Sequence, residues 1–67
     1  MEYVSLNDAM QYPSLYKSWY MVNKCKVYYY NAVDLGGKEC FLLMSGSHFE
    51  KFFSMDEMDA RVLKNVR

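Results

Sequence analysis

The chain has little of several features that would identify a function. Its 67 residues include one His, one Pro and two Cys, and eight Lys and Arg balance eight Asp and Glu. A formal charge of zero argues against a module that binds nucleic acid by bulk charge and against an acidic mimic of DNA. So short a chain buries only about 60% of the surface that it exposes when unfolded. We therefore expect a single domain over residues 1–67, and a two-domain enzyme is excluded.

No apolar stretch approaches the length of a membrane span. The longest runs cover residues 27–30 and 40–44, whereas a helix across a bilayer needs about 20 apolar residues. The first residues, Met1 to Ser5, have neither the basic start nor the apolar core of a signal peptide. With 52% apolar and 18% aromatic residues, the composition is that of a folded domain. We expect a soluble cytoplasmic protein that does not bind membranes.

The residues that could support catalysis or metal binding are few. Cys25, Cys40 and the single His48 match neither a Cys-x-x-Cys redox pair nor the paired ligands of a zinc module. A nucleophile and base could be made from a cysteine and His48, oriented by Glu50. Cys40, however, lies in an apolar run, where a thiol is expected to be inert. We therefore expect reduced thiols, no metal, no cofactor and no catalytic residue.

Capping chemistry near the N-terminus predicts a helix. Ser5 is followed three residues later by Asp8, so the helix should begin at Leu6 and end before Pro13. The next segment, residues 14–22, has both helical and strand periodicity. We favour a helix there, because its first residue is a capping serine and the asparagine that follows it can close a helix.

Residues 24–33 and 39–44 predict an antiparallel β-hairpin. The first run is β-branched and aromatic, the second is apolar, and turn-forming residues separate them. A three-residue loop places Asp34 opposite Lys38 rather than opposite Glu39, which carries a like charge. In this register both faces of the hairpin are apolar.

Two further capping signals follow the hairpin. Ser47 with Glu50 predicts a short helical turn, and Ser54 with Glu57 predicts a C-terminal helix after a break. Four apolar residues share one side of that helix: Met55, Met58, Val62 and Val66. The sequence therefore predicts a small α+β domain, with helical segments at its N-terminus, a central antiparallel β-hairpin and a C-terminal helix packed on the sheet.

The aromatic content predicts a binding surface. The covering elements are too few to bury all the ring area of seven Tyr, four Phe and one Trp, and aromatic residues and Met are enriched at interface centres. We expect a non-catalytic module that binds a host protein. In size and composition it resembles the accessory proteins with which phages and mobile elements inhibit or redirect a host enzyme. The predicted contact residues are Trp19, Tyr20, Tyr28, Tyr29 and Tyr30, with Lys24 and Lys26 as a rim that steers approach.

Two alternatives stay open. The order of two helices and a hairpin resembles a winged helix-turn-helix protein of the excisionase kind, which implies DNA binding with residues 15–22 as recognition helix and 34–38 as wing tip. That helix would carry Lys17 as its one cation, and no Arg precedes Arg61, so nucleic acid is disfavoured as a partner. The other alternative is a homodimer whose hairpin face pairs with its own copy.

Overall fold

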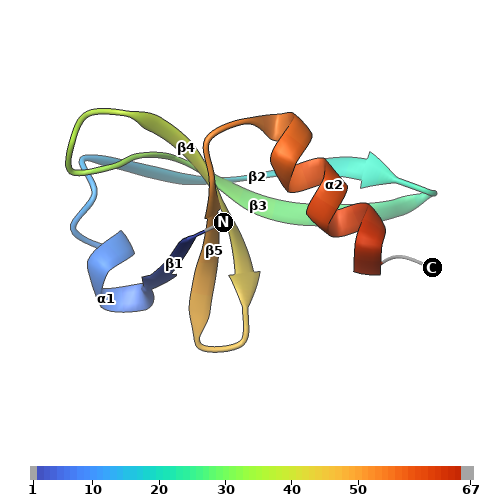
Figure 1. Cartoon of the computed structure of the whole chain (residues 1–67), viewed down its shortest axis with the longest axis horizontal. Coiled ribbons are helices and arrows are strands. Elements are labelled where there is room, and N and C mark those ends of the chain that lie inside the picture. The colour runs from blue at the N-terminus through green and yellow to red at the C-terminus, as the bar shows by residue number, and fades with distance from the viewer. Residues whose placement is uncertain (1, 66–67) are drawn as a thin grey trace.

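The protein is built around one five-stranded antiparallel sheet (Figure 1). The computed structural model describes residues 2–65. Along the chain the elements are β1 (Glu2–Ser5), α1 (Leu6–Ala9), β2 (Ser14–Val22), β3 (Cys25–Val33), β4 (Glu39–Ser45), β5 (His48–Phe52) and α2 (Met55–Asn65). Across the sheet the order is β1-β5-β4-β3-β2, so β2 to β5 form consecutive hairpins and β1 pairs with β5. β1 and β2 are therefore the edge strands of this sheet.

Residues 14–22 form strand β2, and the helix predicted there is wrong. β2 pairs with β3 along its whole length. The two-residue turn between them has a positive φ at both Asn23 (49°) and Lys24 (66°), which is the type I′ geometry whose twist matches that of a β-hairpin. Pairing over the whole strand outweighs the helical spacing of its apolar residues.

Residues 48–52 form strand β5, and the helical turn predicted there is also wrong. β4 pairs with one edge of β5 and β1 with the other, so strand pairing satisfies the backbone groups on both sides. Ser47 is not a helix cap but follows Gly46 in the turn between β4 and β5, where Gly46 has a φ of 61°. Glu50, the second half of the supposed capping box, lies buried in the middle of the strand.

The sheet dominates the fold, because its strands hold more than twice as many of the described residues as the two helices do. The predicted α+β arrangement of helical segments around a lone hairpin is therefore wrong. Two of its helical segments are strands that extend the hairpin into a larger sheet. The winged-helix arrangement fails for the same reason, since residues 15–22 do not form a recognition helix.

The hairpin of β3 and β4 has the predicted register. Asp34 N–H donates to the carbonyl oxygen of Lys38 at 2.9 Å, across the three-residue loop. Tyr30 lies opposite Leu42 in the ladder, as expected. The pairing that closes the loop is therefore the one that avoids two like charges facing each other.

Both capped helix starts are confirmed. Ser5 Oγ accepts a hydrogen bond from the N–H of Asp8 at 3.1 Å, although α1 is a single turn. Ser54 Oγ accepts one from the N–H of Glu57 at 3.2 Å, at the start of α2. Val66, predicted on the inner side of this helix, lies outside the described residues. No helix within the described part of the chain is long and apolar enough to cross a membrane.

Each face of the sheet carries its own core. On one face α2 contributes to a cluster of Val22, Tyr29, Phe52, Met58 and Val62. On the other face, α1 and β1 contribute to a cluster of Val4, Ala9, Ala32, Cys40, Leu42 and Phe49. Figure 1 shows α1 near one end of the molecule and α2 near the other, where the β2–β3 hairpin extends. At that end, a described helix therefore covers one face of the β2–β3 hairpin and none covers the other face.

Candidate functional site

The β2–β3 hairpin sorts its aromatic residues onto two faces. Successive side chains of a strand point to opposite faces, and the register places Trp19 opposite Tyr28 and Ser18 opposite Tyr29. Tyr29 belongs to the cluster under α2. Trp19 and Tyr28 must then lie on the face opposite α2.

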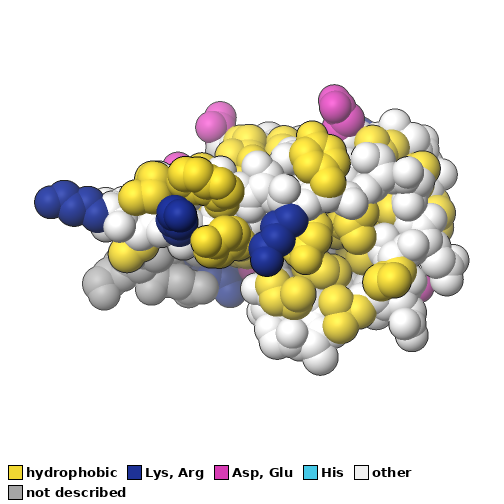
Figure 2. Space-filling view, turned by 180° about the vertical axis from the view of Figure 1, so that it is seen from behind, with side chains coloured by type: hydrophobic (Ala, Val, Ile, Leu, Met, Phe, Trp, Pro, Cys, Tyr) yellow, Lys and Arg dark blue, Asp and Glu magenta, His cyan; other side chains and the backbone are white. Residues whose placement is uncertain are grey.

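On that face five side chains form an exposed group, which we call the hairpin patch: Lys17, Trp19, Met21, Lys26 and Tyr28. Trp19 is 52%, Met21 53% and Tyr28 51% exposed, and both lysines are exposed as well. Figure 2 views the molecule from the side opposite to that of Figure 1 and shows hydrophobic side chains gathered around Lys or Arg side chains towards the hairpin end. Large apolar side chains that stay exposed together are a common sign of an interaction site.

Each ring of the hairpin patch has an ammonium group near it. Lys26 Nζ lies 4.8 Å from the centre of the Trp19 ring, and Lys17 Nζ lies 5.2 Å from the centre of the Tyr28 ring. These are cation–π distances. Residues 14–33 contain no Asp or Glu, so the two strands contribute positive charge alone.

Lys24 lies at the tip of the hairpin, in the turn between β2 and β3. Its side chain is exposed. It adds a third positive charge to the end of the hairpin, next to the strands that carry the patch. Of the seven predicted contact residues, the structure thus groups Trp19, Tyr28 and Lys26, with Lys24 beside them.

The other three predicted contact residues lie elsewhere. Tyr29 is buried under α2, with 9% of its surface exposed, and so belongs to the core rather than to a contact surface. Tyr30 is on the face of the patch but packs against the core there, edge-on to Phe49 with ring centres 5.5 Å apart. Tyr29 thus has little exposed surface, whereas Tyr30 is only partly buried.

Tyr20 faces α2 and is partly buried. Its hydroxyl donates to Asp59 Oδ1 at 3.2 Å. Burial, followed by the hydrogen bond to Asp59 and its negative charge, raises the pKa of Tyr20 from 10.0 to about 12. The hydroxyl therefore stays protonated and fastens α2 to the hairpin.

Sequence reasoning missed two members of the patch, Lys17 and Met21. Both alternate with Trp19 along β2, at the spacing of one face of a strand. Read with strand periodicity, residues 14–22 would have placed them on one face together. The helical reading separated them, because residues two apart lie on different sides of a helix.

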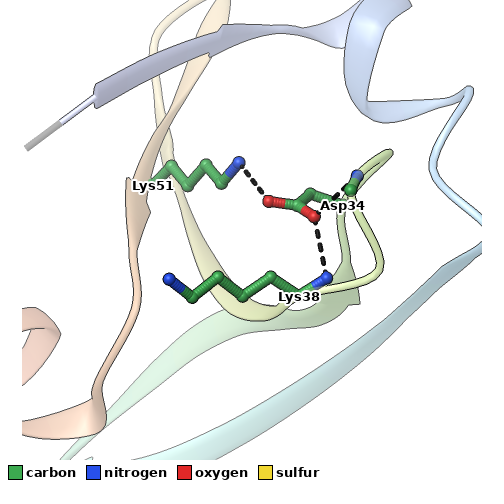
Figure 3. A network of polar contacts seen from close by, with 4 residues as sticks. Asp34, Lys38 and Lys51 are labelled. Atoms are coloured by element: carbon green, nitrogen blue, oxygen red, sulfur yellow. Dashed lines mark hydrogen bonds and ion pairs between the residues drawn. The ribbon is translucent and has the colours of Figure 1, made fainter.

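A polar network joins the β3–β4 loop to β5 (Figure 3). Asp34 Oδ2 accepts a hydrogen bond from Lys51 Nζ at 2.9 Å. Asp34 Oδ1 accepts from the backbone N–H groups of Gly36 at 3.0 Å and Lys38 at 2.9 Å. The bond from Lys51, followed by that from Lys38, holds the pKa of Asp34 below its ordinary value. The carboxylate thereby shapes the loop and anchors it to the sheet.

Lys51 is itself buried in this network. Burial alone would lower its pKa, but Asp34 and Tyr12 outweigh burial and leave the pKa raised. Its Nζ also lies 5.0 Å from the centre of the Phe53 ring and 5.4 Å from that of Tyr12. The ammonium group therefore stays charged, and its role is structural, because it bonds to Asp34 of the loop.

Of the residues considered for catalysis, His48 and Glu50 share strand β5, whereas Cys40 belongs to β4. Cys40 lies in the core on the α1 side, and burial raises the pKa of its thiol. Glu50 instead accepts a hydrogen bond from Arg61 of α2 at 3.0 Å. His48 stacks edge-on against Tyr3, with ring centres 4.7 Å apart. Among residues 2–65 no three His, Cys, Asp or Glu side chains converge, and no pocket is present.

Comparison with protein-family models, with curated proteins and with solved structures found no match to this chain.

Proposed function

We propose that this protein is a non-catalytic module that binds another protein through the hairpin patch. It acts in the cytoplasm, in keeping with its two free cysteines. By covering a working surface of its partner it inhibits or redirects a host enzyme, as the small accessory proteins that it resembles in size and composition do.

The observation that supports this proposal is the exposure of Trp19, Met21 and Tyr28 on one face of the hairpin. Trp and Tyr are the residue types most enriched among the residues that carry binding energy, and Met is enriched at interfaces. The rings of Trp19 and Tyr28 lose little conformational freedom on binding, because neighbouring strand residues and lysines already flank them.

Charge indicates what the partner presents. Lys17 and Lys26 lie over the rings, Lys24 lies at the tip of the hairpin, and no acidic residue occurs in either strand. A complementary surface has an apolar centre and carboxylates at its rim. We therefore expect the partner to be a protein with an acidic border around the site that receives Trp19 and Tyr28.

The test compares variants of the patch with a matched control. Trp19→Ala and Tyr28→Ala each remove one exposed ring. Tyr16→Ala is the control, because Tyr16 is 60% exposed and lies on the other face of β2. A protein captured from the native cell and then purified should bind the wild type and Tyr16→Ala equally, and should bind each patch variant at least about tenfold more weakly. Equal binding by all four proteins would contradict the proposal.

Charge reversal tests the predicted chemistry of the partner. Lys26→Glu should slow association, and exchange of a facing acidic residue of the partner for Lys should restore the rate. An association rate that Lys26→Glu leaves unchanged would show that the rim does not face carboxylates.

Exposed rings flanked by lysines also occur in proteins that bind single-stranded nucleic acid. A random single-stranded oligonucleotide should therefore be titrated with the protein at increasing salt. We expect Trp19→Ala not to weaken any binding of the oligonucleotide. Binding that falls steeply with salt and is lost in Trp19→Ala would assign the patch to nucleic acid and overturn the proposal.

A further inference from the structure

The outer edge of β2 is a second surface of the hairpin. β2 spans nine residues, and β3 is its neighbour on one side, whereas no described element pairs with it on the other. The opposite edge of the sheet, β1, has four residues. A long edge strand without Pro presents a row of unpaired backbone groups that can pair with another strand.

The turn after β2 fixes which backbone groups face outward. In a turn of this kind the carbonyl oxygen of the first residue accepts a bond from the N–H of the fourth, so Val22 and Cys25 form a hydrogen-bonded pair. Such pairs alternate with non-hydrogen-bonded ones along an antiparallel ladder. The even-numbered residues of β2 therefore bond to β3. The residues whose N–H and C=O groups point to the free edge are Leu15, Lys17, Trp19 and Met21.

The strand is complementary to a second copy of itself. Ser18 is the middle residue of Ser14–Val22, so an antiparallel pair of β2 strands related by a two-fold axis at Ser18 overlaps along the whole strand. In this register Lys17 of one copy faces Trp19 of the other, and Leu15 faces Met21. Each of these is a pair of residues with outward backbone groups, as a hydrogen-bonded pair requires.

Charge argues against a neighbouring register. Lys17 is the one charged residue of β2. A two-fold axis at Lys17 would place two lysines opposite each other, which is destabilising. An axis at Ser18 places each Lys17 beside a tryptophan ring, where a cation is favourable. The formal charge of the chain is zero, so two copies do not repel each other through their net charge.

We infer that two copies of this chain pair through β2 and join their sheets into one continuous sheet with its two-fold axis at Ser18. The interface is made by backbone bonds at the edge and uses the strand that also carries three of the five residues of the hairpin patch. The two patches then lie side by side across the axis. This goes beyond the proposed function, because it holds whether or not a partner protein binds.

The first test is the mass of the wild-type protein in solution. Sedimentation equilibrium should show a dimer that dissociates on dilution. A monomer at every concentration would overturn the inference. So would a series of larger assemblies, because two-fold pairing uses the β2 edge of both copies and then stops.

The second test fixes the register with a disulfide. At a non-hydrogen-bonded pair the Cα atoms are about 4.5 Å apart, which a disulfide can span. In a Cys25→Ser background, which removes the exposed thiol, Ser18→Cys should oxidise to a cross-linked dimer. Met21→Cys is the control: Met21 is 53% exposed but faces Leu15 of the other copy, so it should stay uncross-linked. Equal cross-linking at both positions would rule out this register.

A third variant blocks the edge without a cysteine. Lys17→Pro removes an N–H that points outward, and proline is tolerated on edge strands. We expect the dimer to be lost while the circular dichroism spectrum remains that of the folded wild type. Folded Lys17→Pro that still sediments as a dimer would contradict pairing through β2. None of these measurements involves the partner protein. A negative result here would therefore not contradict the proposed function, and a failure of the proposed function would not contradict the dimer.

Discussion

Tyr28 and Tyr29 are neighbours in the sequence and have opposite surroundings in the structure. Tyr28 is 51% exposed in the hairpin patch, and Tyr29 is 9% exposed in the cluster under α2. The strand period of two separates them by the full thickness of the sheet. The same aromatic run therefore supplies both a core residue and a contact residue.

This difference predicts opposite effects of the same substitution. Tyr29→Ala should destabilise the protein by about 3 kcal/mol or more, because it leaves a cavity in the core. That corresponds to a fall in melting temperature of more than about 10 °C for a domain of this size. Tyr28→Ala should change stability by less than about 1 kcal/mol. Thermal unfolding followed by circular dichroism measures both, and similar losses would contradict the assignment of faces.

A second stability prediction concerns Glu50 and Arg61. Glu50 is buried and accepts a hydrogen bond from Arg61 Nη2 at 3.0 Å, while its other oxygen, Oε1, has no partner among the described residues. Arg61→Ala leaves the carboxylate buried without a counter-charge. It should cost about 3 kcal/mol, towards the lower end of the range for broken buried pairs because Arg61 is partly exposed.

The control removes both charges together. Glu50→Leu with Arg61→Leu replaces the pair by apolar side chains, and such exchanges are often neutral or stabilising. Denaturant unfolding should therefore show that the double variant is more stable than Arg61→Ala alone. A double variant that is less stable than Arg61→Ala would show that the ion pair stabilises the fold by more than its desolvation cost, which would contradict this prediction.

The loss of folding stability at acidic pH should depend on Asp34. The pKa of Asp34 is lowered in the folded protein from its ordinary value of 3.8. A group of this kind contributes stability that is present above its unfolded pKa and is lost as the pH falls through the folded pKa. The difference in melting temperature between wild type and Asp34→Asn should therefore be largest near neutral pH and shrink below about pH 4. A difference that stays constant on acidification would show that the carboxylate charge does not stabilise the loop.

Tyr20 should act at the opposite end of the pH scale. Its pKa rises from 10.0 to about 12 on folding, so its contribution is complete below pH 10 and is lost as the pH rises towards 12. Tyr20→Phe removes the hydroxyl that bonds to Asp59 and with it this dependence. The stability advantage of wild type over Tyr20→Phe should therefore fall between about pH 10 and about pH 12. The two proteins differ in this one hydroxyl, so the comparison isolates its contribution.

The sequence predicted the elements that local chemistry determines. Ser5 and Ser54 cap helices where expected, and the charges around Asp34 chose the correct hairpin register. The faces of the hairpin were also predictable, including the separation of Tyr28 from Tyr29. In these cases the deciding interaction lies within a few residues along the chain.

The errors occurred where distant pairing decides. Residues 14–22 fit a helix and a strand, and the pairing with β3 that selects the strand is not visible in the segment itself. Its turn, Asn23 with Lys24, lacks the glycine that usually marks type I′ geometry. β5 is buried on both faces, but two of its buried residues, Glu50 and Lys51, are charged. The strand therefore shows neither the continuous apolar run of a buried strand nor an alternation of apolar and polar residues. Without knowing which face α2 covers, Trp19 could not be distinguished from Tyr29 as a contact residue.

Lys24 links the stability of the hairpin to its proposed function. Its φ of 66° lies in the left-handed region, which a residue with a side chain adopts at a cost and glycine adopts freely. Asn-Gly is the preferred sequence of a type I′ turn. Lys24→Gly should therefore stabilise the protein by about 0.5–1 kcal/mol, in spite of the larger backbone entropy that glycine has in the unfolded chain.

The same variant removes a positive charge from the rim of the patch, so it should bind the partner more slowly although it is more stable. Lys24→Asn is the matched variant: asparagine tolerates the left-handed region better than lysine, carries no charge and keeps a side chain. We expect both variants to melt at a higher temperature than the wild type and both to associate more slowly with the purified partner. A gain in stability with unchanged association would show that Lys24 lies outside the binding surface, and a loss of stability would show that the turn is not strained by its lysine.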